Sequence, residues 1–379
     1  MGEILMKKSI KIPTIVILVF IVILTSIFYK SIGVKKYIKE NNSFDLINVN
    51  NYDVFLSGEN HTFAKSDKFK QEIFTYLNKK AGVKNIIEEA GVCSVYLLNE
   101  YIQSGNEEYL KSYMSKLKGT MAYTREKYEF YKWLYKYNSE LDEDLKINVY
   151  GVDVEHDSLA AINGIEVLID KNKPVPKSLV ESITLVKNKD IRAIKSLKLA
   201  YEENKKDCEE YFGDKFIYFE NGIENLYPSG GGQDMRDKIM MRNFSALYSL
   251  KKGEKFFGQF GSEHIYQDYM NTDYVSEDEV RFGILLNGKS SPVKNRVYSL
   301  LCAYENKEGN YPGNNFFDYS LFKNIKEDTF VELCGKNSPF YKKEYLFKGA
   351  KEDNVTCDYI QGLYILKDST KTHTYYPDN

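Results

Sequence analysis

The chain has 379 residues, of which 43% are hydrophobic and 28% are charged. This composition is enough for one large folded domain or two ordinary ones, and it excludes a wholly disordered chain. The net charge of -2 gives no overall basic field, so we expect no nucleic-acid partner.

The N-terminus divides into a short arm, residues 1–11, and an apolar segment, residues 12–29, which has no charged side chain. A helix of that length rises about 27 Å, close to the hydrocarbon thickness of a bilayer. No small-residue cleavage site follows, so an uncleaved single-pass anchor is favoured over a signal peptide. Lysines flank both ends and barely decide the orientation, but we expect a cell-membrane protein whose globular part lies outside the cytoplasm.

The rest of the chain predicts a linker followed by one α/β domain. Residues 30–50 are polar and rich in Asn and Lys, and the domain spans residues 51–370. Strand-like apolar stretches alternate there with amphipathic helices, which is typical of a mainly parallel central sheet flanked by helices. The first strands are expected over 52–59, 83–91 and 146–155, and the first helices over 68–82 and 124–141.

The second half of the domain continues this pattern after a helical insertion at about 157–228, which we expect to cover the sheet or cap it. A helix is expected over 234–250. Residues 371–379 are expected to be a frayed tail. The remaining strands are predicted over 255–264, 280–288, 296–304, 329–335 and 359–368.

Five cysteines are widely spaced and include no Cys-x-x-Cys pair. An odd, sparse set argues against a disulfide framework and against a structural zinc site. We therefore expect buried, free thiols.

One motif match is misleading. The sequence GILLNGKS, Gly283–Ser290, fits the phosphate-loop pattern, but its four central residues favour a strand and Pro292 favours a turn. We therefore expect no nucleotide site. The Gly-x-Ser-x-Gly elbow of serine hydrolases and the His-Glu-x-x-His zinc motif are both absent.

Acidic residues and histidines follow four of the predicted strands. The carboxyl ends of parallel strands lie on one edge of a sheet, where sites form. Carboxylates and imidazoles from four separate segments would therefore meet in one pocket. The residues concerned are Glu59, His61, Glu88, Glu89, Asp153, Glu155, His156, Glu263 and His264.

These stretches resemble the erythromycin esterase family, hydrolases that open macrolide lactones. The resemblance is carried, in order, by GENHT, NIIEEAG, YTREKYEFYKWLYKYN, INVYGVDVE, MRDKIMMRN and the strand that ends in His264. The family has two residues between its first Glu and His, whereas this chain has one. The resulting Gly-Glu-x-His loop is similar to that of haem-binding surface lipoproteins and of Wnt-cleaving membrane metalloproteases. The resemblance implies functional roles for Glu59, His61, Glu89, Glu126, Arg236, Asp237 and His264.

Three functions fit these residues. In the first, the protein hydrolyses an ester or lactone of a small molecule without a cofactor: His61 is the general base, Glu59 or Glu89 orients it, and His264 is the acid or oxyanion partner. Arg236 would hold negative charge. In the second, His61, His264 and Glu59 bind a divalent metal that hydrolyses an ester or a peptide. In the third, the protein binds haem or another ligand without catalysis. Asp153, Glu126, Asp237 and Glu263 would support the site in each case.

Overall fold

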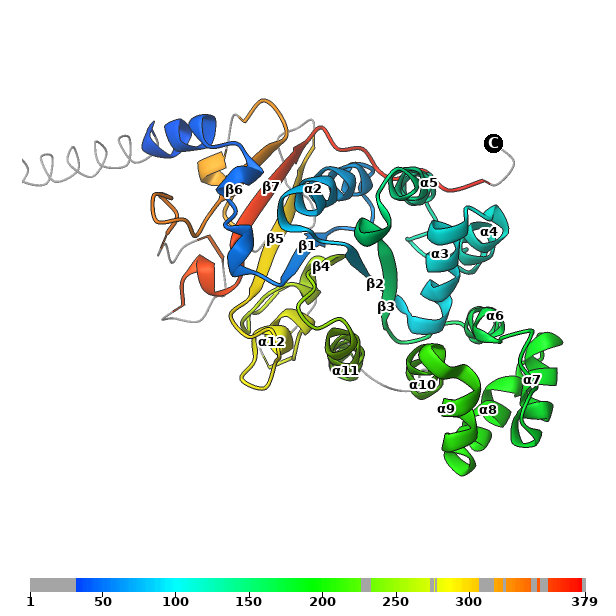
Figure 1. Ribbon diagram of the computed structural model, residues 1–379. Helices are drawn as coiled ribbons and strands as arrows, with labels where there is room; N and C mark the ends of the chain where they lie inside the picture. The colour runs from blue at the N-terminus through cyan, green and yellow to red at the C-terminus, as the bar shows by residue number, and fades with distance from the viewer. Residues whose placement is uncertain are drawn as a thin grey trace, which may run out of the picture.

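A computed structural model describes residues 32–225, 233–272, 276, 278–306, 317–322, 325–341, 346–347 and 354–376. Within these residues, seven strands form one sheet in the order β3-β2-β4-β1-β5-β7-β6 (Figure 1). Neighbouring strands are parallel except β6, which is antiparallel to β7. The predicted mainly parallel sheet is therefore confirmed.

The strands are buried on both faces, as expected where helices cover a parallel sheet. Side chains alternate between two cores: Val54 and Leu56 of the central strand belong to one, and Phe55 belongs to the other. The strands are β1 (Val54–Glu59), β2 (Asn85–Gly91), β3 (Asn148–Asp153), β4 (Phe256–Gly261), β5 (Val297–Glu305), β6 (Thr329–Glu332) and β7 (Gly362–Lys367).

Helices cover both faces of the sheet. The helix α2 (Lys65–Ala81) buries Phe69, Ile73 and Leu77, and it ends at Gly82, whose φ of 67° suits glycine. On the same side lie α3 (Val92–Ser104), α4 (Glu107–Lys116) and α5 (Arg125–Ser139), while α11 (Gln233–Leu250) and α12 (Phe282–Asn287) cover the other face (Figure 1).

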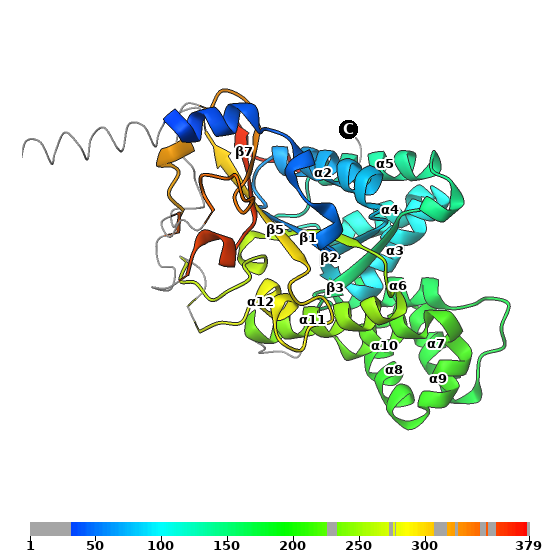
Figure 2. The ribbon, with the colours of Figure 1, turned by 60° about the vertical axis from the view of Figure 1, so that its left-hand side comes forward.

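The insertion is helical but does not cap the sheet. Its helices extend beyond the β3 edge of the sheet (Figures 1 and 2) and share a small core of their own. That core also contains Cys93 and Tyr96 of α3, so the insertion packs on α3 instead of on the sheet. The helices are α6 (Ser158–Leu168), α7 (Val180–Lys187), α8 (Arg192–Glu203), α9 (Lys205–Phe212) and α10 (Phe216–Glu224).

The strand predicted over 280–288 is wrong, because these residues include the helix α12. Phe282 and Leu286, four residues apart, are both buried on one side of this helix. No helix opens after Ser290, and a phosphate loop requires one. The GILLNGKS match therefore lacks the structural context of a nucleotide site.

Much of the predicted linker packs onto the domain. Residues 32–40 are helical, and Val34 and Ile38 are buried in the same core as β1. Residues 12–29, the predicted anchor, lie outside the described residues. Among the residues that are described, no helix is both long and apolar enough to cross a bilayer.

The cysteine prediction is correct for three residues and wrong for two. Cys93, Cys208 and Cys302 are buried free thiols. Cys334 and Cys357 instead form a disulfide, with their Cα atoms 5.6 Å apart. The fold brings them together because the loop after β6 and the turn before β7 lie side by side.

The tail is also less free than predicted. The backbone N–H of Thr372 donates to the carbonyl of Thr62, and the N–H of Arg125 donates to the carbonyl of His373. Tyr375 is buried against Tyr128. These contacts tie residues 370–375 to the loops before α2 and α5.

Candidate active site

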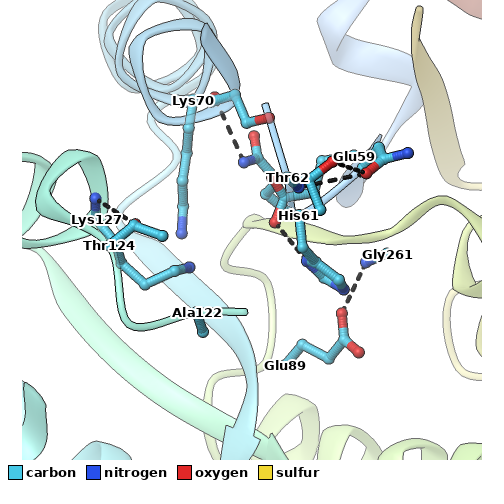
Figure 3. Close-up of polar contacts among 12 residues, drawn as sticks. Glu59, His61, Thr62, Lys70, Glu89, Ala122, Thr124, Lys127 and Gly261 are labelled. Carbon is cyan, nitrogen blue, oxygen red and sulfur yellow. Dashed lines mark hydrogen bonds and ion pairs between the residues drawn. The ribbon is translucent and has the colours of Figure 1, made fainter. Parts of the chain in front are cut away.

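The end of β1 supplies a hydrogen-bonded carboxylate and imidazole. Glu59 is the last residue of β1, and its Oε1 lies 3.0 Å from Nδ1 of His61 (Figure 3). The Glu59 side chain is 8% exposed, whereas that of His61 is 34% exposed. Glu59 therefore forms the inner member of the pair, and the imidazole reaches the cavity.

The electrostatics of this pair favour a proton on His61. Burial raises the pKa of Glu59, but the hydrogen bond and charge of His61 outweigh it and bring that pKa to about 2. Burial alone lowers the pKa of His61, whereas Glu59 and then Glu89 raise it above its usual 6.5. A carboxylate that stabilises the imidazolium makes the neutral ring a stronger base.

Nε2, the second ring nitrogen of His61, lies in a narrow space beside Glu89 and Gly261. The N–H of Gly261, at the end of β4, donates to Oε2 of Glu89 over 2.7 Å (Figure 3). A Cβ on Gly261 would lie 3.1 Å from Nε2 of His61 and 3.7 Å from Oε2 of Glu89. The His61 ring therefore lies beside Glu89, over a backbone position where an added Cβ would be tightly packed against the ring.

His264 lies on the other side of Glu89. It follows β4 in a 3₁₀ turn, with Nδ1 2.8 Å from Oδ1 of Asp237 and Nε2 3.4 Å from Oε1 of Glu89. Asp237 also accepts the N–H of Phe282. Burial lowers the pKa of His264, but Glu89 and Asp237 raise it overall to about 10. His264 is therefore an imidazolium at neutral pH.

Arg236 joins these residues from α11. Its Nη2 lies 2.6 Å from Oε1 of Glu89, and its Nε lies 2.9 Å from Oδ2 of the fully buried Asp153. Its Nη1 lies 3.3 Å from Nε2 of His264. The guanidinium thus fixes Glu89 against Asp153 by charge-assisted hydrogen bonds.

These side chains line a cavity with two adjacent lobes. The main lobe has a volume of about 900 Å³ and the side lobe about 480 Å³. Such volumes suit a small organic ligand. The two lobes share the wall formed by Glu59, His61, Glu89, Met121 and Arg236. Of the described residues in the insertion, only Asp157 and Ala160 line either lobe, so the insertion does not shape the main lobe.

The structure brings together most of the predicted site residues. Asp153 lies behind Arg236, and Glu263 accepts a hydrogen bond from Thr272 at the edge of the main lobe. Glu88, the neighbour of Glu89, pairs instead with the buried Lys70. The predicted residues that line the main lobe are Glu59, His61, Glu89, Arg236, Asp237, Glu263 and His264.

Glu126 lies outside both lobes, contrary to its predicted role in the site. Its Oε1 lies 2.6 Å from Nδ1 of His373, in the C-terminal segment. The first turn of α5 places Glu126 against the C-terminal segment, whereas the following residue, Lys127, lines the side lobe. Sequence reasoning missed Lys127, although a cation in the first turn of a helix opposes the helix dipole and is a signal of such a role.

The cluster does not have the arrangement of a metal site. The described residues contain no group of three His, Cys, Asp or Glu side chains placed to hold a metal ion. The Arg236 guanidinium occupies the space between Glu89, Asp153 and His264, so a cationic side chain already compensates these carboxylates. The proposed set of His61, His264 and Glu59 therefore does not fit a metal.

Comparisons with known proteins identify the fold. No protein-family sequence model matches the chain, and no curated protein sequence matches it. Three solved structures share the fold at low sequence identity. A succinoglycan biosynthesis protein has a TM-score of 0.62 and 16% identity, with 86% of this chain and 90% of that chain covered. A Bacillus cereus protein has a TM-score of 0.56 and 16% identity, with 88% and 92% covered.

The third structure is an erythromycin esterase variant in its open conformation. Its TM-score is 0.54 at 13% identity, and the match covers 86% of this chain and 92% of that chain. The predicted resemblance to erythromycin esterases is therefore confirmed at the level of the fold. A shared fold hosts many functions, so the activity must be argued from the site.

Proposed function

We propose that the protein is a hydrolase of an ester or lactone in which His61 activates water. The observation that carries this proposal is the Glu59–His61 pair, whose imidazole faces the imidazolium of His264 across Glu89 in one cavity. The shared fold with an erythromycin esterase supports the reaction class.

The reaction needs two proton transfers, one from water to His61 and one to the leaving oxygen. Nε2 of neutral His61 takes a proton from water as the water oxygen attacks the ester carbonyl carbon. The proton then passes to the leaving oxygen when the bond from that carbon to the leaving oxygen breaks, giving a carboxylic acid and an alcohol. General base catalysis of this kind contributes about 10²- to 10⁴-fold.

The other side chains prepare the site for this step. Glu59 stabilises the imidazolium that forms on His61. His264 is charged at neutral pH and lies on the main lobe, where its positive charge can stabilise the developing oxyanion. Arg236 donates to Glu89, and Glu89 in turn pairs with His264, so the guanidinium fixes the carboxylate against which His264 lies.

A panel of nitrophenyl esters and aliphatic lactones tests the proposal on the purified full chain. We expect hydrolysis of at least one compound by the wild type and a loss of roughly 10²-fold or more with His61→Ala. An inactive wild type across the panel, or an unchanged rate in the variant, would contradict the proposal. Circular dichroism of the variant checks that the fold is retained.

We further propose that residues 12–29 anchor the protein in the cell membrane with the folded domain outside the cytoplasm. The uncharged apolar run supports the anchor. The Cys334–Cys357 disulfide supports the orientation, because disulfides persist in oxidising compartments. Protease added to intact cells should then digest the folded domain, whereas a protected domain would show the opposite orientation.

A further inference from the structure

The C-terminal segment, residues 369–376, crosses from β7 to α5 along the carboxyl edge of the sheet (Figure 1). At its start, the N–H of Ala64 donates to the carbonyl of Thr370, and the N–H of Thr372 donates to the carbonyl of Thr62, each over 2.9 Å. These bonds attach the segment to the loop that carries His61.

Further along, the segment binds the loop that precedes α5. The N–H of Arg125 donates to the carbonyl of His373, and the N–H of Tyr375 donates to the carbonyl of Tyr123. Glu126 accepts both the N–H and the Nδ1–H of His373. The segment thus joins two walls of the main lobe, the His61 loop and the loop that carries Met121.

Two residues of this segment line the main lobe. Ser369 is 8% exposed, and its hydroxyl has no hydrogen-bond partner among the described residues. Lys371 is exposed at the same lobe, and no carboxylate of the described residues lies within 4.0 Å of its Nζ. A buried hydroxyl without a partner is unfavourable, so a bound ligand is the natural source of the missing partner.

We propose that Ser369 and Lys371 bind a carboxylate on the substrate, the hydroxyl and the ammonium each donating a hydrogen bond to it. This inference rests on the proposed function in one respect: it takes from it that the substrate carries an ester. The segment acts as a strap: its bonds to the His61 loop and to α5 hold the carboxylate-binding groups at a fixed place relative to the general base. Glu126 is a positioning residue in this scheme, because it acts through His373.

Two kinetic substrates and one inert ligand test this proposal on the full chain. The substrates are 4-nitrophenyl butyrate and 4-nitrophenyl hemiglutarate, which differ in the terminal carboxylate, and the ligand is glutarate. We expect the hemiglutarate to have a lower KM than the butyrate in the wild type. Lys371→Gln should raise the KM of the hemiglutarate about tenfold and leave the KM of the butyrate unchanged, with kcat unchanged for both.

Ser369→Ala should raise the KM of the hemiglutarate by a similar factor. Ser139→Ala and Lys118→Gln, at exposed positions outside the cavity, serve as matched controls and should change nothing. Thermal unfolding verifies that each variant folds, and Lys371→Arg should restore binding because it keeps the charge. Equal KM values for the two esters in the wild type, or unchanged values in both variants, would overturn the proposal.

Calorimetry with glutarate separates this inference from the proposed hydrolysis. We expect glutarate to bind the wild type and His61→Ala equally, and to bind Lys371→Gln about tenfold more weakly. If no ester is hydrolysed but glutarate binding depends on Lys371, the carboxylate site stands and the hydrolase proposal fails. If glutarate does not bind, the carboxylate site fails whatever the outcome with esters.

Discussion

Glu89 lies between the two histidines of the site: its Oε1 is 3.4 Å from Nε2 of His264, and its Oε2 faces the His61 ring across Gly261. The pKa of Glu89 is held well below its usual value, because the charges of His264 and Arg236 outweigh the effect of burial. One ionised carboxylate therefore organises a base on one side and an imidazolium on the other.

Glu59→Gln tests the inner member of the base pair. The change removes the carboxylate that raises the pKa of His61, so burial should lower that pKa. The rising limb of the kcat/KM profile should move to lower pH, and the plateau should fall roughly tenfold or more because the base is weaker. An unshifted limb would contradict the assignment of this limb to His61.

Gly261→Ala tests the narrow space beside His61. The backbone φ of Gly261 is -51°, which alanine accepts, so the effect should come from the added methyl group alone. That group would lie 3.1 Å from Nε2 of His61 and should displace the ring. We expect kcat to fall about tenfold with little change in thermal unfolding. Gly33→Ala, where nothing lies within 4 Å of the added methyl group, is the control.

His264 makes the stability of the fold depend on pH. Its pKa is about 10 in the folded state and about 6.5 in the unfolded state, so its contribution is complete below pH 6.5 and is lost as pH rises through 10. The free energy of unfolding should therefore decrease as the pH rises from 6.5 to 10, by an amount on the order of a few kcal/mol. His264→Gln should flatten this slope. An identical slope in wild type and His264→Gln would count against a charged His264.

Glu126→Gln distinguishes between two roles of Glu126, the one that the structure indicates and the one that the family resemblance implies. The resemblance implies a direct role in the site, but Glu126 contacts His373 and neither lobe of the cavity. We expect kcat to stay within about twofold and KM to rise by up to about tenfold as the C-terminal segment loosens. If the turnover rate instead fell by roughly a hundredfold or more, the direct role would be restored.

The sequence predicted the sheet and the strand-end clustering because both follow from local patterns. Strands such as Val54–Glu59 begin with an apolar run, and parallel strands place their carboxyl ends on one edge. The helix α3 has no amphipathic pattern, since nine of its residues are buried, and it was not predicted. The helix α12 is only six residues long, and its burial depends on tertiary contacts with α11.

The site was predicted less completely, because several of its features depend on segments far apart in the sequence. The salt bridge between Arg236 and Asp153 joins residues 83 positions apart. The Cys334–Cys357 disulfide and the bonds of residues 370–375 likewise depend on the order of strands in the sheet. The direction in which Glu126 points is set by the start of α5 at Arg125, and a shift of one residue would exchange it with Lys127.

Imidazole rescue of His61→Gly tests the central claim most directly. The change leaves a space beside Glu59 into which free imidazole can enter as the missing base. Using the best ester of the panel, we predict a loss of roughly 10²-fold or more in rate, recovered in part as imidazole is added. Recovery should weaken below about pH 7, where imidazole becomes protonated. Two controls correct for direct attack of imidazole on the ester. One is the reaction of the ester with the same imidazole in the absence of protein, and the other is the variant that also carries Glu59→Gln. A His61→Gly protein that hydrolyses the ester at the wild-type rate without imidazole would contradict the account.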